Sequence, residues 1–294
     1  PLGVLVLIAI WATTVFLYGG LPALVFRGQW SSLGAGIVIA LGVSAMWAAG
    51  TLWPWLTTWL ALGGAGIATG HLARTGKPVS VVFGVGALIV ISATLLQIVP
   101  VYGVMAEIVR TRLDGIIEVL RMQLTSAGNS AAVVDESVVA LNKIADTLVR
   151  LLPSGMAMAA VTQYALGFGV FSYVVVAPAG QRAVVPPFAT WRAPFGLAVL
   201  VLMAAAGRFL GGETIKIIAD NLLAMLALVY VVTGMSLVEH FMRRVRIGWF
   251  GRIAMYIMLF LAQILGFLVV ALIGFGDSYF DWRARAERAV DAGN

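Results

Sequence analysis

Long runs without a charged residue alternate with short polar segments along the chain. Five runs contain no Asp, Glu, Lys or Arg: residues 1–26, 28–73, 78–106, 151–181 and 253–276. A membrane-spanning helix needs about 20 apolar residues, so the second run can hold two spans and each of the others one. Together with two apolar segments between residues 193 and 238, the pattern predicts eight spans: 3–25, 33–50, 53–70, 79–101, 154–177, 194–210, 216–238 and 253–275.

Residues 104–152 interrupt this apolar pattern with five basic and six acidic side chains. Their apolar residues still recur at helical spacing, which predicts two amphipathic helices. These apolar positions are Val104, Ile108, Ile116 or Ile117, Leu120, Leu124, Val134, Val138, Leu141, Leu148 and Leu152. The turn-forming residues 126–130 lie between the helices and favour a helical hairpin outside the hydrocarbon. Its arms could project, pack on each other or lie along the lipid surface.

Composition supports a membrane protein, because 61% of the 294 residues are hydrophobic and 11% are charged, against about 25% charged in ordinary globular proteins. The predicted fold is therefore all-α: a polytopic transmembrane bundle of about eight spans with an extramembrane amphipathic hairpin. The predicted parts are spans one to four (1–103), the hairpin (104–152), spans five to eight (153–276) and a polar tail (277–294). The absence of cysteine excludes disulfides, thiol catalysis, iron–sulfur clusters and Cys-ligated zinc.

One cluster of polar residues surrounds the Gly211–Gly212 connection. Its members are Arg208, Glu213, Lys216, Asp220 and Asn221. On one helix Lys216 and Asp220 are four residues apart, and Glu213 and Lys216 three apart, so both pairs can face each other. Two interpretations stay open: ion pairs that neutralise one another at the membrane boundary, or a binding site for a small charged solute.

Other residues carry little sign of catalysis or metal binding. His71 and His240 have no further ligands at metal-binding spacing, and no nucleophile, metalloprotease or P-loop motif occurs. We therefore predict a protein that is no enzyme, with no cofactor, no metal and no nucleic-acid partner. Arg243, Arg244 and Arg246 directly follow a span and are typical of an anchor for phospholipid headgroups.

Small residues four positions apart permit close helix crossings. Such pairs are Gly36 with Ala40 and Gly66 with Gly70.

Two motifs in the C-terminal half carry a family resemblance. Trp191, Arg192 and Pro194 precede a span, and Asp277, Asp281 and Arg283 follow the last one. These motifs resemble the YybS-like family of uncharacterised bacterial multi-pass membrane proteins, which is distantly similar to substrate-binding subunits of energy-coupling-factor transporters and to MreD. The resemblance implies a bundle in the bacterial inner membrane with a solute cavity and a face for a partner. Independently of it, we expect Asp277 to pair with Arg192 or Arg208 and lock the bundle.

The function predicted from these features is a scaffold or partner-binding module in a membrane complex, contacting lipid and using residues 104–152 for a protein partner. The alternatives are a subunit that binds or transports a small molecule and, from the arginine-rich edges alone, an enzyme acting on lipid-linked substrates. Lys and Arg number 10 on one predicted side and 9 on the other, so the positive-inside rule does not set the orientation. The resemblance places both termini in the cytoplasm.

Overall fold

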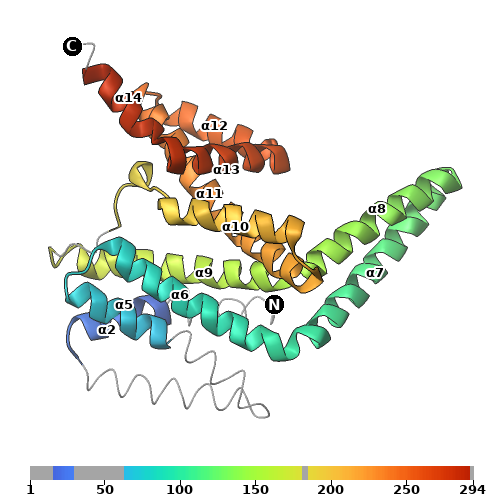
Figure 1. The fold of residues 1–294 in the computed structure, drawn as a ribbon, viewed down its shortest axis with the longest axis horizontal. Coiled ribbons are helices and arrows are strands. Elements are labelled where there is room, and N and C mark those ends of the chain that lie inside the picture. The colour runs from blue at the N-terminus through green and yellow to red at the C-terminus, as the bar shows by residue number, and fades with distance from the viewer. Residues whose placement is uncertain (1–15, 30–62, 181–184, 292–294) are drawn as a thin grey trace. The chain divides into compact units, whose positions relative to one another are not determined.

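The computed structural model describes residues 16–29, 63–180 and 185–291, and every regular element in these ranges is a helix (Figure 1). The chain divides into two compact units, Pro1–Val185 and Pro186–Asn294. The predicted all-α class is confirmed for the part of the chain that the structure describes.

The first unit is built around aromatic side chains. Its helices are η1 (Phe16–Gly20), α2 (Leu21–Phe26), α5 (Ala65–Arg74), α6 (Val79–Ile98), η3 (Val99–Val101), α7 (Tyr102–Ser126), α8 (Ala131–Arg150), α9 (Leu152–Phe171) and η4 (Ser172–Val176). Tyr18 and Tyr164 meet edge to face with their ring centroids 5.4 Å apart. The Tyr164 hydroxyl lies 2.8 Å from Thr69 Oγ1, so the buried polar groups of α5 and α9 satisfy each other.

Glycines allow the helices of this unit to approach closely. A Cβ atom added at Gly70 would lie 2.5 Å from the carbonyl oxygen of Pro22, a contact too short for any side chain. The close crossing predicted for the pair Gly66 and Gly70 is therefore confirmed at Gly70, between α5 and α2. The pair Gly36 and Ala40 lies outside the described residues.

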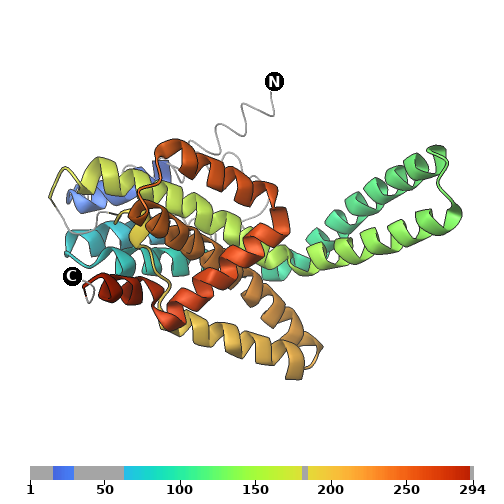
Figure 2. The same cartoon turned by 90° about the horizontal axis from the view of Figure 1, so that it is seen from above.

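Helices α7 and α8 form the predicted hairpin. The arms run antiparallel and extend beyond the ends of α6 and α9 (Figures 1 and 2). Ile117, Val134 and Ala145 are buried between them. At the turn, Gly128 adopts φ +79°, and the Asn129 side chain donates to the carbonyl of Leu124 at 2.9 Å. Of the three arrangements that the sequence leaves open, the structure shows the arms packed on each other.

Polar contacts fix the register of the two arms. Arg110 lies 3.1 Å from Asp114 on its own helix and 2.6 Å from Asp146 across the hairpin, and it donates to the side chain of Asn142 at 2.9 Å. Three of the apolar positions that recur at helical spacing, Val104, Ile108 and Leu148, are exposed and do not pack between the arms. The spacing predicted the helices but not which apolar residues the arms bury.

The second unit consists of η5 (Phe188–Thr190), α10 (Phe195–Leu210), α11 (Glu213–Arg244), α12 (Trp249–Leu261), α13 (Gln263–Phe280) and α14 (Trp282–Asp291). Its core contains Leu226 and Tyr230 of α11, and the Tyr230 ring meets Phe275 of α13 with centroids 5.4 Å apart. Helices α11 and α13 cross at Gly234 and Gly274, where a Cβ at Gly274 would lie 2.7 Å from the amide nitrogen of Gly234.

Three described helices are long and apolar enough to cross a membrane: Val79–Ile98, Leu152–Val176 and Glu213–Arg244. They correspond to the spans predicted at 79–101, 154–177 and 216–238. The span predicted at 194–210 is the apolar helix α10, which is shorter, with 16 residues. The spans predicted at 3–25, 33–50 and 53–70 lie partly or wholly outside the described residues, so the count of eight is not confirmed.

The last predicted span, 253–275, falls on a bent pair of helices. The chain bends by 112° between α12 and α13, where Gln263 adopts the left-handed conformation with φ +48° and interrupts the helical hydrogen bonding. With this bent pair counted as one span, the described residues hold up to four.

Candidate functional site

The C-terminal motif changes the direction of the chain. Helix α13 ends where Asp281 adopts the left-handed conformation with φ +46°, a geometry that aspartate tolerates better than most side chains. Helix α14 begins at the next residue. The carboxylate of Asp277 accepts a hydrogen bond from the amide of Trp282 at 3.1 Å, and that of Asp281 accepts one from Ala284 at 3.3 Å. Both aspartates thus satisfy amide groups at the start of α14.

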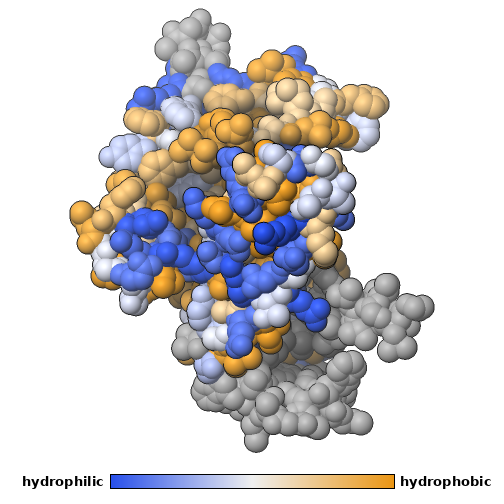
Figure 3. All heavy atoms as spheres, turned by 90° about the vertical axis from the view of Figure 1, so that its right-hand side faces the viewer, coloured by the Kyte–Doolittle hydropathy of each residue, from blue (hydrophilic) through white to orange (hydrophobic). Residues whose placement is uncertain are grey.

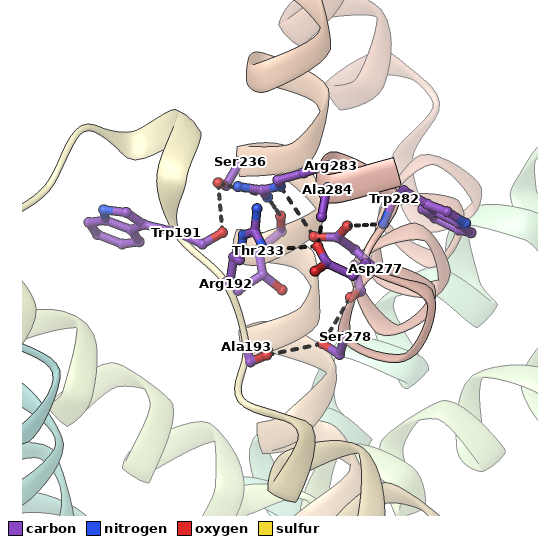
Figure 4. Close-up of polar contacts among 12 residues, drawn as sticks. Trp191, Arg192, Ala193, Thr233, Ser236, Asp277, Ser278, Trp282, Arg283 and Ala284 are labelled. Carbon is purple, nitrogen blue, oxygen red and sulfur yellow. Dashed lines mark hydrogen bonds and ion pairs between the residues drawn. The ribbon is translucent and has the colours of Figure 1, made fainter. Parts of the chain in front are cut away.

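This reversal buries Arg283, whose side chain is 1% exposed, against Asp277 (Figure 4). Arg283 Nε lies 3.2 Å from Asp277 Oδ2. The guanidinium also donates to the carbonyl of Ala189 at 2.7 Å, to that of Thr233 at 3.4 Å and to the Ser236 hydroxyl at 3.2 Å. Burial lowers the pKa of Arg283, and the carboxylate of Asp277 acts in the opposite direction.

The segment before α10 is held in the same place by backbone carbonyls. The Ser236 hydroxyl lies 2.6 Å from the carbonyl oxygen of Phe188 and 2.9 Å from that of Trp191. The Trp191 indole donates to the carbonyl of Pro186 at 2.9 Å, and Pro194 stands at the N-cap of α10. The two motifs that carry the family resemblance therefore meet, through α11, in one network of bonds.

The prediction that Asp277 pairs with Arg192 or Arg208 was wrong. Asp277 pairs with Arg283, whereas Arg192 pairs with Asp281 at 2.8 Å and Arg208 with Asp220. In an uninterrupted helix, residues six apart point about 120° away from each other. Asp277 and Arg283 meet only because the left-handed Asp281 ends the helix between them.

Sequence reasoning also missed Thr233 and Ser236, which connect α11 to the Arg283 network. Both are polar and buried, three residues apart on one face of the mainly apolar stretch 222–238 of α11. Polar residues on a single face of a span often bond to a neighbouring helix, so their spacing was the available signal.

The polar cluster around Gly211 and Gly212 is organised by an ion pair across the connection. Arg208 Nε of α10 lies 2.6 Å from Asp220 Oδ1 of α11, whereas the sequence predicts a partner for Asp220 in Lys216 of its own helix. The Asn221 side chain donates to the carbonyl of Ile217, one turn earlier, at 2.9 Å. Glu213 is exposed in the first turn of α11, and Lys216 is half-buried. The contact between Arg208 and Asp220 favours the ion-pair interpretation.

Comparison with models of protein families assigns the chain to one family. A family model described as predicted membrane protein (DUF2232) matches residues 2–278. The chain belongs to this family. Neither the curated proteins nor the solved structures gave a match.

For this DUF2232 protein, the family description and the long apolar helices agree on a membrane protein. The matched range contains Trp191, Arg192, Pro194 and Asp277 and ends before Asp281 and Arg283. Arg283 forms an ion pair with the buried carboxylate of Asp277 and donates hydrogen bonds to two backbone carbonyls and a hydroxyl of the same unit. Such contacts join α11, α13, α14 and the segment before α10, which is a structural role.

Proposed function

We propose that this DUF2232 protein is a non-enzymatic integral membrane module whose hairpin α7–α8 binds a helical segment of a protein partner. The observation that carries the proposal is a row of exposed large apolar side chains on α7. Val104, Ile108, Val119 and Met122 are 63%, 57%, 49% and 56% exposed, respectively. At about 100° per residue they fall within an arc of about 60°, which we call the outer row.

The outer row lies on the side of α7 away from the buried Ile117, so α7 carries two apolar faces and α8 covers one of them. Exposed apolar patches outside the bilayer are typical of protein-binding surfaces, and an amphipathic partner helix covers such a row in the usual way. The nearly balanced charge of the hairpin, five basic against six acidic residues, disfavours nucleic acid and anionic lipid as its ligand. Figure 3, seen from the side toward which the hairpin points, shows hydrophobic residues beside hydrophilic ones.

The alternative of a solute-binding or transport subunit has less support. Its candidate site was the cluster of Arg208, Glu213, Lys216, Asp220 and Asn221, where the charges of Arg208 and Asp220 satisfy each other at 2.6 Å. Three further hypotheses accompany the proposal of a partner-binding membrane module. They are a location in the bacterial inner membrane, cytoplasmic termini, and a relation to YybS-like proteins, to energy-coupling-factor subunits and to MreD.

Photocrosslinking tests the proposed binding surface. With a benzophenone amino acid in place of Val119, we expect one discrete protein adduct in cells. The matched position is Lys143, which is exposed on α8 outside the outer row, and a probe there should give little of this adduct.

A second substitution checks that the adduct depends on apolar contact. Met122→Glu places a charge one turn from the probe and should abolish the Val119 adduct, because a desolvated carboxylate is costly. Glu118→Gln, an exposed change beside the same probe, should leave it intact. An adduct of equal yield from Val119 and Lys143, or one unaffected by Met122→Glu, would contradict the proposal.

A further inference from the structure

A concentration of arginines marks the corner between α11 and α12. Residues 239–252 contain four arginines and one glutamate and hence a formal charge of +3. Arg243 and Arg244 occupy the last turn of α11, Arg246 lies in the connection and Arg252 in the first turn of α12. We call these four residues the arginine corner.

A buried carboxylate organises the arginine corner. Glu239 is 5% exposed; it lies 2.6 Å from Arg243 Nε and 3.3 Å from Arg252 Nη1, and it accepts a hydrogen bond from the Tyr256 hydroxyl at 3.0 Å. Arg252 Nε also donates to the carbonyl of Ile247 at 2.9 Å. Since a guanidinium has five N–H groups, these contacts fix both arginines and leave donors for another acceptor. The two side chains remain 50% and 31% exposed.

The end of α11 places a further arginine where glycine is usual. The amide of Ile247 donates to the carbonyl of Met242 at 2.9 Å, and that of Arg246 to Arg243 at 3.1 Å. This pair of bonds closes a helix with a left-handed residue, and here that residue is Arg246 with φ +58°. Glycine would adopt this conformation with less strain, so the backbone alone does not explain an arginine at this position.

The length of the uncharged stretch of α11 places the arginine corner at the level of lipid headgroups. Between Asp220 and Glu239, α11 has 18 uncharged residues, about 27 Å of helix, which matches a hydrocarbon core of about 30 Å. None of the residues of α12 is buried, and its first residues, Trp249 and Phe250, are 66% and 81% exposed. Exposed aromatic side chains beside basic ones are typical of the membrane interface.

We propose that the arginine corner binds the phosphate group of an anionic phospholipid and that Glu239 is the positioning residue of this site. Guanidinium groups match phosphate oxygens in pairs of hydrogen bonds, and the excess positive charge favours an anionic headgroup over a zwitterionic one. The site is separate from the hairpin, so either proposal can fail without the other.

Competitive lipid binding tests this site. The full chain, purified in detergent, is mixed with equal amounts of phosphatidylglycerol and phosphatidylcholine of identical acyl chains, and native mass spectrometry gives the ratio of the two bound lipids. We expect the wild-type chain to prefer phosphatidylglycerol. Arg244→Gln with Arg246→Gln, two exposed positions, should reduce this preference about thirtyfold.

The matched control is Arg285→Gln with Arg288→Gln, which removes the same charge from exposed positions of α14 and should keep the wild-type ratio. Equal retention of both lipids by the wild-type chain would overturn the proposal. So would an unchanged preference in the Arg244 and Arg246 variant, or an equal loss in the control.

Glu239→Gln distinguishes binding by arginines that Glu239 holds in place from binding by net positive charge alone. The substitution raises the local charge to about +4, so attraction by charge alone predicts a stronger preference for phosphatidylglycerol, whereas loss of the carboxylate that fixes Arg243 and Arg252 predicts a weaker one. A stronger preference overturns the positioning role. If this variant melts below the working temperature, Tyr256→Phe removes only one donor to Glu239, and an unchanged ratio for it would count against that role.

Discussion

Replacing Arg283 with alanine should lower the stability of the protein more than any other single truncation in the C-terminal motif. The substitution leaves Asp277, itself 6% exposed, as a buried carboxylate without its cation, and it removes the donors to Ala189, Thr233 and Ser236. Breaking a buried ion pair in this way costs about 3 to 5 kcal/mol. The measurement is the midpoint of thermal unfolding of the full chain in detergent.

Two further variants show whether the network is responsible. Arg288→Ala truncates an exposed arginine of the same helix and should change the midpoint little. Arg283→Lys keeps the charge beside Asp277 but lacks the planar set of donors, so its midpoint should fall between those of the other two. Equal midpoints for Arg283→Ala and Arg288→Ala would show that the Arg283 network does not stabilise the fold.

Replacing Gly234 with leucine should separate α11 from α13. A Cβ at Gly234 would overlap the backbone carbonyl of Val270, and one at Gly274 would overlap that of Tyr230. Backbone atoms cannot rotate away, so the helices must move apart and lose their contacts. Forcing extra atoms into a packed interface costs about 1 to 3 kcal/mol, occasionally more, and we expect the upper end because the obstacle is backbone.

The control is Gly196→Leu in α10, where an added Cβ meets no atom within 4 Å. It should keep the wild-type unfolding midpoint, while Gly234→Leu lowers it by several degrees. A similar midpoint for both variants would mean that the α11–α13 crossing is looser than these contacts indicate.

The features that the sequence predicted well are local ones. The hairpin followed from the spacing of Ile117, Leu120 and Val134 and from the turn at residues 126–130, because helical periodicity and turn residues act over a few positions. The close crossing at Gly70 was visible for the same reason, as two glycines one turn apart.

The features that the sequence missed depend on single backbone conformations or on distant partners. Gln263 carries no sequence signal for a left-handed conformation, so the bend between α12 and α13 could not be foreseen. The pair of Asp277 and Arg283 depends on the helix break at Asp281. The exposure of the outer row of α7 could not be predicted, because apolar periodicity does not tell which of two apolar faces packs against α8.

We expect the hairpin to stand outside the bilayer, on one side of it, as the part of the protein available to a partner. The chain contains no cysteine, so a single Asn129→Cys substitution at the exposed tip reports on this position alone, and Ala157→Cys, at a fully buried site in α9, serves as the control. Sealed membrane vesicles of either orientation are treated with a membrane-impermeant maleimide, before and after permeabilisation. We expect the Asn129→Cys variant to react from one side only and the Ala157→Cys variant from neither. Protection of the Asn129→Cys thiol from both sides, in intact and permeabilised vesicles, would show that the hairpin does not stand outside the bilayer.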